Sequence, residues 1–290
     1  RAIDGGWAAP EFTHALTEWS RANILSIIEF PYKTAVEFYA KHCPEDAIRL
    51  FTSPELLSAQ NGRNLHFILD ALNNLNVKVP SATLMEIIAR AAKTPKTWPW
   101  NSTRTIAINA LMRSCPSEAL AIAESLIHDE DSSSEMLEIL RKHHGIGSAW
   151  PPPGFELSQE DRLIVDHLQD AIEAFGEIGN GGLEQYFVNF TGNRWRRHIT
   201  CMHAIGFEKG ASTLERAAFL IDAQGASPNR KERVKQYLAL SKENEQLLKQ
   251  MNGTFWGANR CVAEFRYMLK HLDLFQRINA ANLAADNRKN

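Results

Sequence analysis

Apolar residues recur every three and four positions along most of the chain, which is the spacing of one face of an α-helix. The clearest run is Leu65, Ile68, Leu69, Leu72 and Leu75. The strict alternation of apolar and polar residues that marks a half-buried strand is missing from the sequence. The pattern therefore predicts an all-α protein.

Three prolines mark regular helix starts in the first half of the chain. Pro44, Pro80 and Pro116 each follow a short turn, and each stands 36 residues from the next. Proline suits the first helical turn, where its missing N–H leaves no hydrogen bond unmade. A period of this length built from two helices resembles a HEAT-like helical-repeat array, although three prolines can also share a spacing by chance.

A second run of prolines divides the chain. Pro151, Pro152 and Pro153 follow a glycine-containing helix end at His143–Ser148, and consecutive prolines cannot continue a helix. We expect a HEAT-like α-helical repeat domain over 1–148, a proline-rich linker over 149–156, and a second helical domain over 157–290.

The second half opens with a long predicted helix. Ser158 is a plausible N-cap, because acidic residues follow it in the first turn. The helix is expected to run to about Ile178 and to break at Asn180-Gly181-Gly182. Later helices are expected at about 198–205, 212–223, 229–251 and 257–274.

Four acidic residues of this helix share one face. Asp166, Asp170, Glu173 and Glu177 follow at i, i+4, i+7 and i+11. Like charges at this spacing repel, so a basic partner surface would recover the cost of placing them together. We expect an exposed acidic stripe that binds such a surface, with Glu184 beyond the break as a further contact; the ordinary alternative is a solvated helix face.

The run that follows carries a family resemblance. The segment from Asn180 to Asn189 resembles the N-G-G-[FL]-x-Q-[YF]-[FL]-x-N signature of a bacterial family typified by a double-stranded-DNA mimic protein. The resemblance covers about 160–225 well and the rest of the C-terminal half loosely. It implies an all-helical domain that binds a transcription factor through an acidic surface imitating DNA phosphates.

The residues that match the signature are expected to be structural. Glycine supplies positive φ, the two aromatic residues supply core, and the polar side chains bond the backbone. This set comprises Asn180, Gly181, Gly182, Gln185, Tyr186, Phe187 and Asn189.

A basic cluster lies just beyond the signature. Arg194, Trp195, Arg196 and Arg197 could hold a phosphate or stack a base, with Trp98 and Trp100 lining the same groove. The arginines could equally fold back on the acidic helix of their own domain. The sequence leaves both interpretations open.

Signatures of metal, cofactor or catalytic chemistry are missing from the sequence. The four cysteines contain no C-x-x-C pair, and His198, Cys201 and His203 do not share one helical face, so we expect no metal. No zinc-protease, nucleophile-elbow or P-loop pattern is written, so we expect no cofactor and no catalytic residue.

Bulk charge argues against a polybasic nucleic-acid binder. Lys and Arg total 32 against 34 Asp and Glu, for a net charge of −2. No apolar run approaches a membrane span, so we expect a cytoplasmic protein without a membrane partner. The chain does not begin with Met, which leaves a trimmed leader open.

These observations favour a non-catalytic bacterial protein that occupies the basic, nucleic-acid-binding surface of a partner. The partner would be a transcription factor or a toxin neutralised by an immunity or antitoxin protein. The alternative is a HEAT-like nucleic-acid-binding protein or nucleic-acid-modifying enzyme, and a third possibility is a scaffold.

Overall fold

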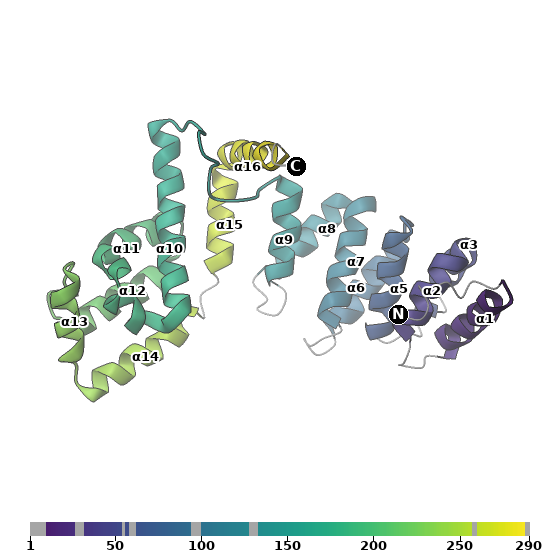
Figure 1. The fold of residues 1–290 in the computed structure, drawn as a ribbon, viewed down its shortest axis with the longest axis horizontal. Helices are drawn as coiled ribbons and strands as arrows, with labels where there is room; N and C mark the ends of the chain where they lie inside the picture. The colour runs from purple at the N-terminus through teal and green to yellow at the C-terminus, as the bar shows by residue number, and fades with distance from the viewer. Residues whose placement is uncertain are drawn as a thin grey trace. The chain divides into compact units, whose positions relative to one another are not determined.

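The protein is helical throughout the part that the structure describes. A computed structural model describes residues 10–26, 32–53, 56–57, 62–93, 100–127, 133–256 and 260–287, and none of these residues forms a strand. Figure 1 shows the helices in chain order. The prediction of an all-α protein is confirmed.

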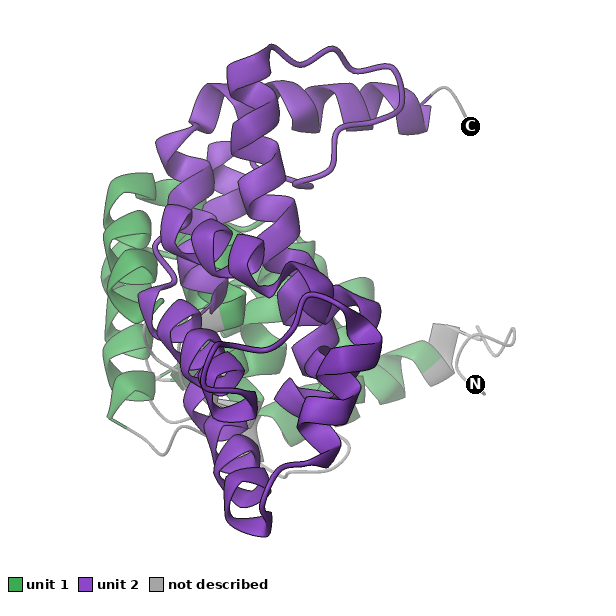
Figure 2. Ribbon diagram, turned by 90° about the vertical axis from the view of Figure 1, so that its left-hand side faces the viewer, with its two compact units in different colours: residues 1–139 green, residues 140–290 purple. Residues whose placement is uncertain are grey.

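The chain divides into two compact units, residues 1–139 and 140–290 (Figure 2). The division falls inside α9 (Ser133–His144), ahead of the proline-rich segment predicted as the linker. Residues 140–148, expected in the first domain, lie in unit 2 because α16 binds their carbonyls. Gln276 Nε2 donates to His144 O over 2.7 Å, and Asn279 Nδ2 donates to Gly145 O over 3.0 Å. The predicted linker also contacts α16, through a bond from Asn282 Nδ2 to Trp150 O.

Unit 1 is a succession of short helices in which most helices pack against the next helix along the chain or the one after it. They are α1 (Pro10–Ser26), α2 (Tyr32–His42), α3 (Pro44–Phe51), α5 (Gly62–Asn74), α6 (Ser81–Ala92), α7 (Trp100–Ser114), α8 (Pro116–Leu126) and the first part of α9. Pro44 and Pro116 occupy the first turn of α3 and α8, and Pro80 directly precedes α6. The predicted helix starts are therefore confirmed, while the HEAT-like repeat stays a prediction.

Unit 2 is organised around one long helix. Its elements are α10 (Gln159–Val188), the 3-10 helix η1 (Phe190–Arg194), α11 (Trp195–Ala204), α12 (Glu208–Ile221), α13 (Arg230–Leu238), α14 (Lys242–Trp256), α15 (Arg260–Lys270) and α16 (Leu272–Asn287). α10 packs against α11, α13 and α14, and α12 packs against α11 and α14. Ser158 caps α10 as predicted, because its Oγ accepts from Asp161 N over 3.0 Å.

The single helix predicted at 229–251 is wrong. α13 ends at Leu238 and α14 begins at Lys242. A new N-terminus forms there because Ser241 Oγ accepts from Asn244 N over 3.2 Å.

Three buried phenylalanines join the helices of unit 2. Phe175 of α10, Phe207 at the start of α12 and Phe255 of α14 pack edge to face, with ring centroids 5.0 to 6.1 Å apart. Aromatic pairs at these angles and distances add to the free energy of ordinary apolar burial. This core holds α10 in a fixed position relative to α14.

Candidate functional site

α10 is bent at its glycine pair. Gly182 has φ 77° and ψ −175°, a conformation open essentially to glycine alone, while Gly181 is extended. Asn252 of α14 holds the bend, because its Oδ1 accepts from Leu183 N over 2.8 Å and its Nδ2 donates to Glu184 Oε2 over 2.9 Å. The helix therefore continues beyond the break that the sequence predicted, in a new direction.

The aromatic residues of the signature lie in the core. Tyr186 and Phe187 are fully buried, and the Tyr186 hydroxyl lies 2.6 Å from His198 Nδ1. Burial raises the pKa of Tyr186, and it lowers the pKa of His198 to about 4 with help from the nearby Arg194 charge. Both groups are therefore neutral near pH 7.

The polar residues of the signature bond a side chain instead of the predicted backbone. Gln185 Nε2 donates to Glu177 Oε1 over 3.1 Å, and Asn189 Nδ2 donates to the same oxygen. Gln185 and Asn189 lie one helical turn apart after the bend, and the bend brings both amides to the Glu177 carboxylate before it. Glu177 is thus half-buried and bonded within the bend.

The predicted exposed acidic stripe is wrong at its centre. The Asp170 side chain is buried, with 7% of the residue exposed. Arg194 Nη1 lies 3.0 Å from Asp170 Oδ1, and Arg197 Nε donates to Asp170 Oδ2. A carboxylate loses water when it is buried, so it needs such charged donors in compensation.

The same two arginines reach the acids on either side. Arg194 also binds Glu173, and Arg197 Nη2 lies 3.9 Å from Asp166 Oδ2. These outer carboxylates stay accessible, since the side chains of Asp166 and Glu173 are 44% and 43% exposed. The surface part of the stripe therefore consists of Asp166 and Glu173, while Glu184 is half-buried against Asn252.

The alternative phosphate-binding cluster is largely engaged inside unit 2. Trp195 is 3% exposed, and its indole N–H donates to Ala226 O over 2.7 Å, so its ring cannot stack on a base. Arg196 lies over that ring at 4.3 Å from its centroid. Trp98 and the side chain of Trp100 lie outside the described residues.

One group of side chains in the described residues has metal-ligand geometry. Atoms of Asp170, Glu173 and His198 lie within 4.8 Å of one another. Arg194 binds both carboxylates, so a guanidinium already supplies the positive charge that a metal ion would bring. Cys201 lies beside the group with its Sγ 3.8 Å from Asp170 Oδ2, and burial raises the pKa of this thiol to about 11.

Sequence reasoning missed Arg233, which is fully buried. Its guanidinium donates to Phe187 O, Ser227 O, Asn189 O and Asn193 Oδ1. It therefore joins the end of α10, η1 and the segment before α13. No signal in the polar run 229–235 separates this arginine from its exposed neighbours.

Residues 156–271 match the family model of DMP19-like proteins. The match spans α10 through α15 and so includes the bend, the buried aromatics and the arginine–carboxylate cluster. It supports the resemblance read from the signature, and it does not extend to unit 1. Comparison of the chain with curated proteins and with solved structures found no match. Within the described residues, no helix is both long and apolar enough to cross a membrane.

Proposed function

We propose that unit 2 is a DNA-mimic-type binding domain that occupies the basic, nucleic-acid-binding surface of a partner protein. The similarity to DMP19-like proteins over residues 156–271 carries this proposal. The partner would be a transcription factor or a nuclease-type toxin, since both present a cationic cleft to nucleic acid. In the second case the chain would act as an immunity protein or antitoxin.

The two accessible carboxylates of α10 would make the contact. Asp166 and Glu173 are seven residues apart on one helix, which separates them by about 10 Å along its axis. Their bonds to Arg197 and Arg194 lie at the surface, where an ion pair contributes less than about 1 kcal/mol. A partner's lysine or arginine can therefore replace these intramolecular bonds at little cost.

Asp170 would have a positioning role in this contact. Its buried carboxylate holds Arg194 and Arg197 beside the helix, so their guanidinium groups stay in place when a partner binds the outer acids. The domain would thus present two carboxylates on a rigid support.

The test begins with the full chain as bait in an extract of its native cells. Captured proteins are identified by mass spectrometry, and the principal one is purified. Double-stranded DNA added to the purified complex should displace the partner, because both would occupy one basic surface. A complex that resists DNA competition would contradict the proposal.

Variants then assign the contact to α10. Asp166→Asn combined with Glu173→Gln should weaken binding about tenfold at low salt and flatten its salt dependence. Glu243→Gln removes an exposed acid from α14 and should leave the affinity unchanged. Equal losses in the double variant and the control would show that net charge, and not this helix face, determines binding.

A further inference from the structure

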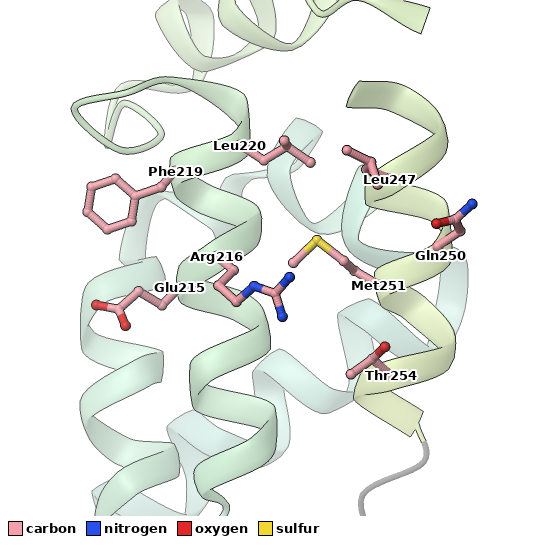
Figure 3. Close-up of a pocket in the computed structure, with 8 residues that line it drawn as sticks. All are labelled: Glu215, Arg216, Phe219, Leu220, Leu247, Gln250, Met251 and Thr254. Carbon is pink, nitrogen blue, oxygen red and sulfur yellow. The ribbon is translucent and has the colours of Figure 1, made fainter. Parts of the chain in front are cut away.

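Unit 2 also has a groove that does not involve the acidic stripe of α10. α12 and α14 pack side by side and border an open space of about 640 Å³ (Figure 3). Leu220 of α12 and Leu247 and Met251 of α14 supply apolar walls. The polar lining residues are Glu215, Arg216, Gln250 and Thr254. Figure 3 shows the two leucines at one end of the space and Arg216 with Thr254 toward the other.

Arg216 places a guanidinium in the space between the two helices. The Arg216 side chain points toward α14, and Glu215, which also lines the groove, projects from the other side of α12 (Figure 3). Among the described residues the Arg216 side chain has neither a hydrogen bond nor an ion pair, in contrast with the side chains of Arg194 and Arg197. A guanidinium beside a methionine attracts a carboxylate, which it can bind through two parallel hydrogen bonds.

The groove is open along its length. Phe219 is 47% exposed and Leu247 is 42% exposed, so the walls face solvent. Leu247, Met251 and Thr254 follow at i, i+4 and i+7, a span of about 10 Å or two helical turns. An open channel of this length between two helices suits the apolar face of a third helix better than an enclosed small molecule.

We propose that this groove binds an acidic amphipathic helix of a partner protein. Two apolar side chains of that helix, one turn apart, would lie against Leu220, Leu247 and Met251, and a carboxylate one turn further on would pair with Arg216. The proposal is independent of the acidic face of α10, which would bind a basic surface. Unit 2 would thus have two binding surfaces of opposite charge preference.

Selection from a display library of random 16-residue peptides tests this without a known partner. The full chain is the target, and the Arg216→Glu variant removes peptides that bind elsewhere. Enriched peptides should combine an acidic residue with two apolar residues three or four positions apart. The proposal is wrong if no peptide remains enriched over the naive library once the peptides that also bind Arg216→Glu have been removed. It is also wrong if the enriched peptides contain no acidic residue.

Affinities of the best peptide, measured by fluorescence anisotropy, complete the test. Arg216→Gln should weaken binding at least about tenfold, whereas Arg162→Gln, an exposed arginine on α10, should change it less than about twofold. Replacing the peptide's acid by lysine should restore binding to Arg216→Glu. Leu247→Gln should weaken binding of the acidic peptide and of its lysine version alike. Circular dichroism checks that each variant is folded.

Three other outcomes reject the helical occupant. A charge swap that restores nothing shows that Arg216 does not contact the acid. If decanoate binds in an Arg216-dependent way and no peptide does, the groove is a site for a small carboxylate. Self-association of the chain that is lost in Arg216→Glu, measured by sedimentation, shows that a second copy occupies the groove.

Discussion

Arg194, which directly precedes α11, forms an ion pair with Asp170 in the middle of α10, and its Nη1 lies 3.0 Å from Asp170 Oδ1. The arginine side chain is 44% exposed and the aspartate side chain only 9%. The buried carboxylate therefore depends on the arginine more than the arginine depends on it. This asymmetry divides the acidic face into a structural centre at Asp170 and accessible flanks at Asp166 and Glu173.

Asp170→Asn should destabilise unit 2 by about 2 kcal/mol, because it weakens charge-assisted bonds to Arg194 and Arg197 at a buried site. Asp166→Asn should cost less than about 0.5 kcal/mol, because its single ion pair is long and half-exposed. Urea denaturation, with hydrogen exchange followed in α10 and α11, measures the difference. Equal costs for the two variants would show that burial at Asp170 does not strengthen its bonds.

Gly182→Ala should destabilise unit 2 by about 2 kcal/mol, because φ 77° with ψ −175° disfavours any Cβ. The added carbon would also lie 2.6 Å from Asn252 Nδ2, which holds the bend. Gly176→Ala is the matched control on the same helix, with open space around the new Cβ, and should stabilise by about 0.5 kcal/mol. Thermal unfolding of both variants compares them, and a Gly182→Ala protein as stable as the wild type would refute the strained-backbone argument.

Arg233→Met should destabilise unit 2 by about 3 kcal/mol or more, because it removes the buried guanidinium that donates to the buried carbonyl of Phe187 and the part-buried carbonyls of Ser227 and Asn189. Arg233→Lys should rescue little of this loss, since one ammonium cannot reach the acceptors that the guanidinium spans. Arg230→Lys serves as the control, because Arg230 is exposed and bonds only Val188 O among the described acceptors. Full rescue by lysine in denaturant titrations would mean that charge alone matters at position 233.

The stability of unit 2 should fall as the pH decreases from about 6.5 to about 4. Burial lowers the pKa of His198 in the folded protein to about 4 from its ordinary value of 6.5, so in this interval the unfolded chain binds a proton that the folded chain does not. The loss attributable to His198 approaches about 3 kcal/mol, and below pH 4 it grows no further.

His198→Gln tests this pH dependence, because burial also lowers the pKa of His66 and His271 and the variant keeps both. The free energy of unfolding is measured from pH 8 to pH 4 for both proteins. The difference between the two curves should be flat above pH 7 and should change by about 3 kcal/mol between pH 6.5 and 4. Parallel curves throughout would show that His198 titrates alike in both states.

Local sequence determined the helical class, the helix starts and the position of the bend. Apolar spacing sets which face of a helix is buried, and Leu65, Ile68, Leu69 and Leu72 are buried as that spacing requires. Ser158 and Gly182 act through backbone bonds and torsions of their own neighbourhood, so sequence alone reveals them. The family signature, Asn180 to Asn189, includes Gly182 and is likewise a local feature of the sequence.

Tertiary structure alone decided which charges are paired. Asp166, Asp170 and Glu173 look equivalent in sequence, yet only Asp170 is buried, because the end of η1 and the first turn of α11 bring Arg194 and Arg197 to its level on α10. Arg233 and Arg216 are likewise both arginines within helices, and one is enclosed by carbonyls while the other faces an open groove. The partner of a long charged side chain depends on where distant backbone passes, and helical periodicity carries no information about that.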